Sequence, residues 1–182
     1  ALDPIAATMM GVQGHDSEIG DYSPEGIAAQ DGLRRKTLAR LAAAPIENER
    51  DRIAKEALED VLTLRGDLFE AGDQYRLSGF RNATTTMRMV FDLMPRQSAE
   101  DWRNIAERLK KLPGGLAAFR VTIEEGQRKG IASARRQVSE AIRQAGAYGG
   151  SAGSPSFFDG LAEAFEQSGV DSGALAAEIR AG

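Results

Sequence analysis

The sequence contains no cysteine, and it has one histidine and one tryptophan among its 182 residues. The absence of cysteine excludes disulfide bonds and thiolate zinc sites. A catalytic zinc site usually takes three protein ligands, commonly with more than one histidine, so a single histidine leaves only carboxylates to complete such a set. We therefore expect no metal or other cofactor to be bound by this chain itself.

Long apolar runs are also missing from the sequence. No run approaches the roughly 20 residues that a membrane-crossing helix needs. The first residues lack the charged and then apolar pattern of a signal peptide. We expect a soluble protein with no membrane span; the compartment is left open, with the cytoplasm favoured.

Neither sign of charge dominates the chain. There are 23 lysine and arginine residues against 27 aspartate and glutamate residues, a formal net charge of -4. The basic residues are interleaved with acids, which argues against a nucleic-acid-binding protein. Hydrophobic residues make up 42% of the chain, enough for one domain of this length to bury a core.

Apolar residues recur at helical spacing over most of the chain. Capping residues, glycines and prolines suggest the helix boundaries: Ser23 and Pro24 mark a start, and Pro113 ends one helix or begins the next. The expected helices cover residues 4–10, 24–44, 50–74, 87–94, 98–112, 113–125, 131–148, 157–167 and 172–181. Residues 78–86 are expected to form a loop or an extended passage, because they are polar and contain three consecutive threonines.

The helix expected over residues 50–74 has a broad apolar face. One row of apolar positions recurs at helical spacing, and a second row widens the stripe. The first row is Ile53, Ala57, Val61, Leu64, Leu68 and Tyr75, and the second is Leu58, Leu62 and Phe69. A face of this width predicts burial from two sides, as for a helix at the centre of a bundle.

These patterns predict an all-α fold, an antiparallel multi-helix bundle with a short C-terminal helical pair. Residues 1–148 would form the bundle, and residues 149–156 a glycine- and serine-rich linker. Residues 157–182 would form the pair, packing on the bundle or on a C-terminal part that is missing here. The only strand candidate, residues 119–124, is rejected because helices flank it.

The stretch around His15 is the first place to look for chemistry. His15 lies beside Asp16 in a loop between two glycines, and Asp21 and Tyr22 follow it. A histidine next to a carboxylate can act as a general base or contribute to a metal site. The other interpretation, which we favour, is that His15 and Asp16 tie the loop to the backbone or cap a helix.

Several segments together resemble a known bacterial family. They are residues 3–8, 14–16, 21–26, 91–95 and 101–106, followed by Arg108, Leu109 and Pro113. In this order they are similar to the N-terminal portion of the family catalogued as domain of unknown function 885. None of these segments is a catalytic signature, so the resemblance rests on their order in the chain and their amino-acid sequences together.

The resemblance implies a largely helical protein similar to zinc metallopeptidases, with a His-Glu zinc-binding helix in its C-terminal half. This chain has no His-Glu pair. The resemblance therefore implies a non-catalytic N-terminal segment that forms one wall of the substrate cleft. Zinc is expected in the full-length family protein, and the expected partners are the remainder of the same gene product and a peptide substrate.

The resemblance also suggests roles for the loop residues. His15, Asp16, Asp21 and Tyr22 would contact substrate or support the residues that do, and none of them would be catalytic. Whether the chain is an enzyme stays open, although it is expected to be inactive alone. The alternative is a free-standing helical module that binds a protein partner through an exposed apolar face.

Overall fold

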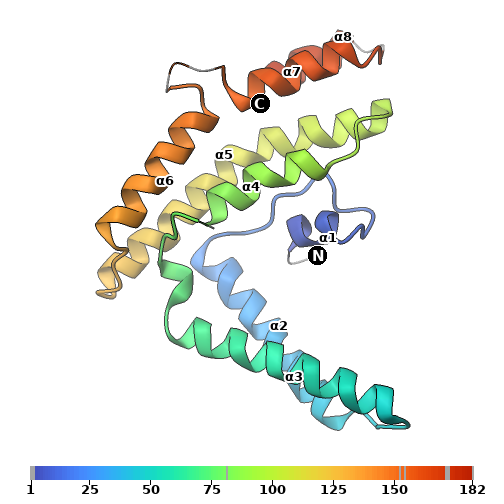
Figure 1. The fold of residues 1–182 in the computed structure, drawn as a ribbon, viewed down its shortest axis with the longest axis vertical. Coiled ribbons are helices and arrows are strands. Elements are labelled where there is room, and N and C mark those ends of the chain that lie inside the picture. The colour runs from blue at the N-terminus through green and yellow to red at the C-terminus, as the bar shows by residue number, and fades with distance from the viewer. Residues whose placement is uncertain (1–2, 81, 152, 154, 171–172, 182) are drawn as a thin grey trace.

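The computed structural model describes residues 3–80, 82–151, 153, 155–170 and 173–181 (Figure 1). The fold is all-α, with no strand in these ranges. In chain order the elements are α1 (Pro4–Met9), α2 (Pro24–Ala43), α3 (Glu49–Glu70), η1 (Asp73–Tyr75), α4 (Ala83–Leu93), α5 (Ala99–Arg128), α6 (Arg135–Tyr148), α7 (Phe157–Gln167) and α8 (Gly173–Ala181). None of the helices in the described part is long and apolar enough to span a membrane.

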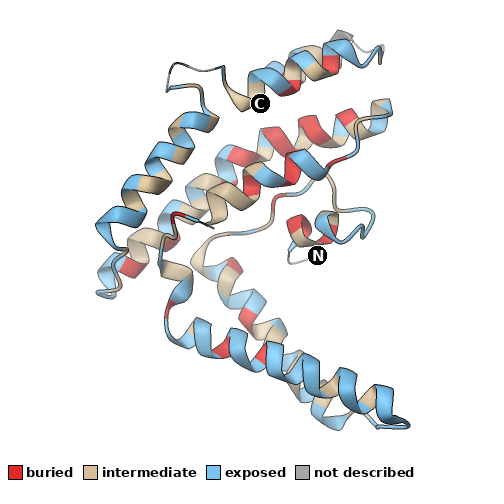
Figure 2. Ribbon diagram, in the orientation of Figure 1, coloured by how far each residue is buried: buried red, intermediate tan, exposed pale blue. Residues whose placement is uncertain are grey.

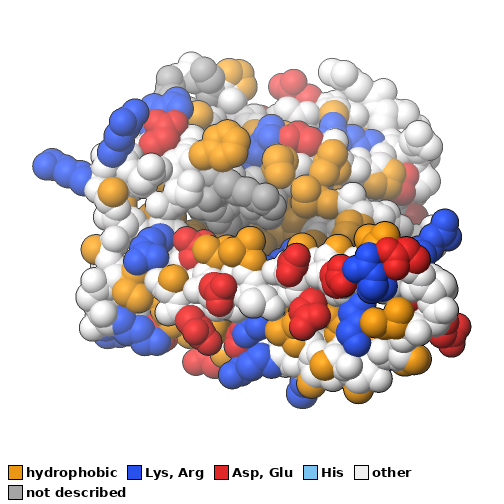
Figure 3. All heavy atoms as spheres, turned by 60° about the horizontal axis from the view of Figure 1, so that its bottom comes forward, with side chains coloured by type: hydrophobic (Ala, Val, Ile, Leu, Met, Phe, Trp, Pro, Cys, Tyr) orange, Lys and Arg blue, Asp and Glu red, His pale blue; other side chains and the backbone are white. Residues whose placement is uncertain are grey.

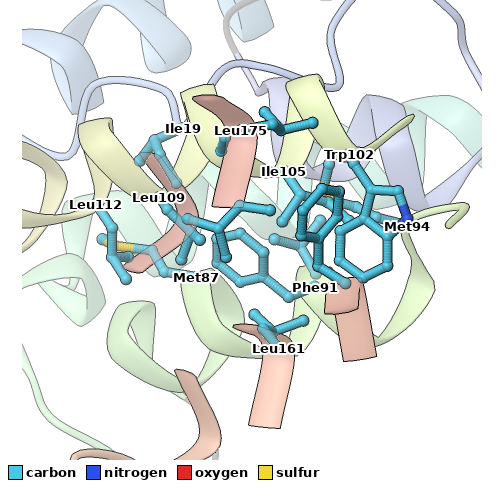
Figure 4. Close-up of a cluster of buried hydrophobic side chains, with 14 of the residues drawn as sticks. Ile19, Met87, Phe91, Met94, Trp102, Ile105, Leu109, Leu112, Leu161 and Leu175 are labelled. Atoms are coloured by element: carbon cyan, nitrogen blue, oxygen red, sulfur yellow. The ribbon is translucent and has the colours of Figure 1, made fainter. Parts of the chain in front are cut away.

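The hydrophobic core lies between α4, α5, α7 and α8. Figure 4 shows Met87 and Phe91 of α4 lying among Ile105 and Leu109 of α5 and Leu161 of α7. Each of these side chains is almost fully buried. Burying one such side chain contributes about 1.5–3 kcal/mol, so this cluster is a large source of stability for the described fold.

Side-chain caps fix the starts of the first two helices. Asp3 Oδ1 accepts a hydrogen bond from the Ala6 amide at the start of α1. Ser23 Oγ accepts one from the Gly26 amide at the start of α2, where Pro24 fills the first helical position. The starts predicted at Pro4, Pro24 and Phe157 are thus confirmed.

Pro113 does not interrupt the helix that contains it. The two helices expected on either side of it are one helix of 30 residues, α5. Proline in a helix interior costs about 3 kcal/mol, because a hydrogen bond is lost. The buried face continues past it, from Leu109 and Leu112 to Gly115 and Thr122, and this packing outweighs the local cost.

The loop expected over residues 78–86 is also shorter than predicted. Helix α4 begins at Ala83 and includes the threonines. Asn82 Oδ1 accepts from the Thr85 amide, and Thr85 Oγ1 accepts from the Asn82 amide, so the pair forms a capping box. Threonine side chains that bond the backbone locally favour a helix start, which the sequence interpretation overlooked.

Two further boundaries differ from the prediction. Helix α3 ends at Glu70, because Gly72 has a φ of 74° and turns the chain into η1. Helix α6 begins at Arg135 rather than at residue 131. The Ser133 hydroxyl just before it accepts a hydrogen bond from the Leu77 amide, 2.6 Å away, which holds this segment outside the helix.

The expectation that residues 50–74 lie at the centre of the bundle is wrong. Figures 1 and 2 show α2 and α3 extending away from the α4–α8 part, with α3 largely exposed. Only Leu62 and Gly66 of α3 are buried. We call α2 and α3 together the α2–α3 pair. Its two helices are joined by the Arg34 guanidinium, which donates to the Leu62 carbonyl and pairs with Asp31.

The last two helices pack on the rest of the fold. Leu161 and Phe165 of α7, with Leu175 and Ile179 of α8, belong to the hydrophobic core, and α8 contacts α5. Residues 152 and 154 of the expected linker and residues 171–172 lie outside the described residues. The division into bundle, linker and pair, and the antiparallel arrangement of the helices, stay predictions.

Candidate functional site

A cleft of about 510 Å³ lies where α1, the segment after it, η1 and the start of α4 come together. Its polar lining includes three carboxylates, those of Asp3, Asp21 and Asp73, and the guanidinium of Arg76. Ile19 and Phe119 are among the apolar residues that line it. The cleft is therefore a mixed surface in which acceptor oxygens stand next to apolar side chains.

Short-range hydrogen bonds hold two of the carboxylates in place. Asp3 caps α1, as described above. Asp21 Oδ1 accepts from the Ser23 amide at 2.9 Å. Gly26 is required beside it, because a Cβ built on Gly26 would lie 2.4 Å from the Asp21 backbone oxygen. The backbone from Asp21 to Gly26 is thus packed so closely that the carboxylate is fixed at the cleft.

Tyr22 lies at the cleft between α1 and α5. Its carbonyl accepts a hydrogen bond of 2.7 Å from the hydroxyl of Thr122, which is fully buried. Burial, with a smaller contribution from the nearby Asp3 carboxylate, raises the pKa of the Tyr22 hydroxyl to about 12, while Arg108 opposes the shift. At neutral pH the hydroxyl is therefore protonated and available as a hydrogen-bond donor.

The loop before the cleft is held by Arg108, which is 0% exposed. Its Nε donates to the Glu18 carbonyl at 2.9 Å, and its Nη2 donates to the His15 carbonyl and to Thr8 Oγ1, each at 2.8 Å. Thr8 Oγ1 in turn donates to Asp16 Oδ1 at 2.7 Å. We call these five residues the Arg108 cluster.

Burial lowers the pKa of Arg108, and the carboxylates of Asp16 and Glu18 oppose this shift. Charge-assisted hydrogen bonds to backbone carbonyls compensate part of the cost of burying the guanidinium. Because Ile19 and Gly20 follow this loop and line the cleft, the Arg108 cluster positions one side of the cleft. Arg108 acts here as a positioning residue.

The four residues singled out in the sequence fall into two groups. Asp21 and Tyr22 line the cleft. The structure places His15 and Asp16 in the Arg108 cluster instead, where they contact Arg108 and Thr8. In this arrangement the His15 carbonyl and the Asp16 carboxylate tie the loop to Arg108 and Thr8. The sole histidine is not part of the cleft lining.

The described residues do not fit a zinc site. Within them no group of three histidine, cysteine, aspartate or glutamate side chains is arranged to hold a metal ion. A catalytic zinc needs about three protein ligands. No chemical step through zinc is therefore assigned to this chain.

Sequence reasoning missed Arg108 and Asp73. Arg108 lies three residues after Ile105 and four before Leu112, so it falls on the apolar face of α5. An arginine at such a position signals a buried, hydrogen-bonded guanidinium. Asp73 had no comparable signal, because only the fold brings η1 to the segment around Asp21.

Comparison with known proteins adds the family. No curated protein matches the sequence. A family model with the description "Bacterial protein of unknown function (DUF885)" matches residues 4–182. That range includes α1, the Arg108 cluster and the cleft lining from Ile5 onward. The chain therefore belongs to this bacterial family, in agreement with the resemblance seen in its sequence.

Proposed function

We propose that this chain is the non-catalytic helical wall of a metallopeptidase-like hydrolase and that the cleft beside α1 binds part of its peptide substrate. The observation that carries the proposal is the acceptor-rich cleft, in which the Ser23 amide holds the Asp21 carboxylate and the Thr122 hydroxyl holds the Tyr22 carbonyl. The metal-binding groups of such a hydrolase would belong to another part of the longer gene product. The metallopeptidase component rests on the sequence resemblance.

The lining indicates which ligand chemistry the cleft suits. Three carboxylates outnumber the single Arg76 guanidinium among its described residues. The buried Oε1 of Gln74, also in the lining, has no hydrogen-bond partner in the described part of the chain. An excess of acceptors favours a ligand rich in donors, such as a peptide amine or a lysine or arginine side chain.

Binding can be measured on this chain directly. The probe is an Ala-Leu-Lys tripeptide that is acetylated at its N-terminus and amidated at its C-terminus, and the matched control is the same blocked peptide with glutamate in place of lysine. We expect the lysine peptide to shift the amide NMR signals of residues 19–22 and 73–76, and the glutamate peptide to shift them much less. Equal effects of both peptides, or shifts elsewhere only, would contradict a cationic ligand.

The role as a wall is tested on the longer gene product. We expect zinc and peptide hydrolysis in the longer protein and neither in this chain. Asp21→Asn in the longer protein should raise KM by about threefold to tenfold with kcat nearly unchanged, because the contact is made equally in ground and transition states. Glu25→Gln, an exposed acid outside the lining, is the matched control.

Stoichiometric zinc and hydrolysis in this chain alone would overturn the proposal. An unchanged KM for Asp21→Asn would show that the cleft does not bind the substrate.

The second candidate function is a helical module that binds a protein partner. The observation that favours it is the exposed apolar face of α3, on which Ile53 and Leu64 are more than half exposed. The reading frame after Gly182 discriminates between the two functions. A frame that continues into a His-Glu helix favours the hydrolase wall, and a stop codon favours the module.

A further inference from the structure

Helix α3 carries apolar residues on two opposite faces, and α2 covers only one of them. The covered face contains Leu62, whose carbonyl accepts from Arg34, and Gly66, where a Cβ would lie 2.5 Å from Arg34 Nη1. Lys55 lies on this face too, because its Nζ donates to the carbonyls of Ala42 and Ala44. The opposite side of the helix faces away from α2.

We call that opposite side the outer face; its residues are Ile53, Ala54, Ala57, Val61, Leu64 and Leu68. Ile53 is 55% exposed, Val61 48%, Leu64 59% and Leu68 45%. In Figure 3, which brings the bottom of Figure 1 forward, hydrophobic side chains lie between charged ones on the surface of the molecule. Contiguous exposed apolar residues of this kind mark interaction sites.

The spacing of the outer face is that of a coiled coil. Positions 54, 57, 61, 64 and 68 are separated alternately by three and four residues, which is the a and d pattern of a heptad repeat. In this register Val61 and Leu68 occupy a positions, and Leu64 occupies a d position. A β-branched residue at a with leucine at d favours two parallel strands.

The flanking charges are complementary to those of an identical helix. Asp60 occupies a g position, and Arg65 occupies the e position five residues later. In a parallel pair, g residues of one helix face e residues of the other, so Asp60 of each copy meets Arg65 of the other. In an antiparallel pair the g positions of the two helices face each other. Asp60 and Asp67 of one copy would then lie opposite Asp60 and Asp67 of the other, which is a repulsive arrangement.

We propose that two copies of this chain associate through the outer faces of their α3 helices as a parallel two-stranded coiled coil. The pairing buries the apolar row that the single chain leaves in water, and it forms two symmetric Asp60–Arg65 ion pairs. Alanine at 54 and 57 allows the helices to approach closely near their N-terminal ends. This association involves neither the cleft nor zinc, so it is independent of the proposed hydrolase wall. It uses the α3 face that the second candidate function assigns to a protein partner, and it names a second copy of this chain as that partner.

The oligomeric state tests the proposal first. We expect sedimentation equilibrium of the full chain to show a dimer that dissociates on dilution, and Leu64→Glu to be a monomer at every concentration. Because Leu64 is more than half exposed in the single chain, we expect its replacement to leave the fold intact. A circular dichroism spectrum of the variant checks this. The control is Ile142→Glu on α6, an exposed apolar residue that is expected to leave the dimer unchanged.

A charge exchange tests the register. Asp60→Arg alone and Arg65→Asp alone should each weaken the dimer by about fivefold to tenfold, because each creates two like-charge contacts. The double variant restores the opposite charges in a parallel pair, so we expect it to dimerise nearly as well as the unmodified chain. A double variant as weak as the single variants would overturn the parallel register.

A single thiol tests the geometry, since the chain has no cysteine of its own. In a parallel coiled coil a d residue faces its own counterpart, so Leu64→Cys should give a disulfide-linked dimer under mild oxidation. Thr63→Cys, on an exposed neighbouring position away from the outer face, should not. A chain that stays monomeric, a dimer insensitive to Leu64→Glu, or equal cross-linking of both variants would overturn the proposal.

Discussion

The α4–α8 part and the α2–α3 pair are both helical, yet they bury their apolar residues very differently. Helix α5 has apolar positions recurring at helical spacing and buries Trp102, Ile105 and Leu109 almost completely. Helix α3 has the same kind of recurrence and leaves Ile53 and Leu64 more than half exposed. Periodicity therefore shows which residues share a face of a helix, but it does not show whether another element covers that face.

Buried polar side chains also have different roles in the two regions. In the α4–α8 part, the fully buried Arg108 organises a loop that lies about 90 residues away in the chain. In the α2–α3 pair, the buried Asp31 pairs with Arg34 at 2.7 Å and with Arg35 at 3.1 Å, all within α2. The first arrangement positions a cleft, whereas the second lies within one helix and orients Arg34, which donates to the Leu62 carbonyl of α3.

The largest expected effect comes from truncating the core. Trp102→Ala should lower the free energy of unfolding by about 4 kcal/mol, because a fully buried ring packed edge-on against Phe165 is removed. Leu64→Ala on α3, measured at low concentration, should change it by less than about 0.5 kcal/mol. Urea unfolding of both variants checks the contrast, and similar losses in the two would refute it.

Removal of the buried Arg108 guanidinium should lower the free energy of unfolding somewhat less than the truncation of Trp102. We expect Arg108→Met to lower the free energy of unfolding by about 3 kcal/mol, because the carbonyls of His15 and Glu18 lose their donor. Hydrogen exchange should accelerate at residues 11–22 first. The matched control is the exposed Arg103→Met on the same helix, which should leave both measurements unchanged; protection of residues 11–22 that survives in Arg108→Met would contradict the positioning role.

The raised pKa of Tyr22 makes stability depend on pH in the alkaline range. The folded protein keeps the Tyr22 proton up to about pH 12, while an unfolded tyrosine loses it near 10. The stabilisation is complete below pH 10 and is lost as the pH rises toward 12, a change of about 2–3 kcal/mol. Tyr22→Phe should remove this part of the decrease, and Tyr148→Phe should retain it. Identical pH profiles for both variants would show that Tyr22 is not responsible.

The smallest effects compare two adjacent glycines in α5. A Cβ on Gly115 would lie 2.7 Å from Ile19 Cγ2, whereas one on Gly114 would have no atom within 4 Å. Gly115→Ala should therefore destabilise the fold by about 1–2 kcal/mol through overpacking. Gly114→Ala should stabilise it by about 0.5–1 kcal/mol, since alanine is the better helix former. Melting temperatures that move in the same direction would contradict the close packing of the segment at Ile19 on α5.

Much of the local structure could be predicted from the sequence, because it depends on neighbouring residues. Asp3, Ser23 and Ser98 cap the helices that they precede, and each short side chain accepts from the amide three residues later. The same reasoning failed at Pro113, where tertiary packing on both sides of the proline outweighs a local preference. The all-α fold class is thus a consequence of short-range hydrogen bonding and apolar spacing.

The cleft could be predicted only in part. Asp21 and Tyr22 were identified from their setting near the sole histidine, and they do line it. Asp73 and Arg76 lie about 50 residues further along the chain, and no local pattern links them to Asp21. The side-chain chemistry of His15 suggests a functional role, but the Arg108 cluster holds this residue by its backbone carbonyl, a role that any residue type can fill.

The sequence by itself determined several helix starts, such as those at Pro4, Pro24 and Phe157, which residues share a helix face, and that no thiolate or multi-histidine metal site is available. Only the tertiary structure decided which of those faces are covered, and it alone brought α1, η1 and α4 around one cleft. The physical reason is the separation along the chain of the residues that interact. Caps and helical hydrogen bonds join residues three or four positions apart, whereas burial and cleft formation depend on contacts between segments that are distant in the chain.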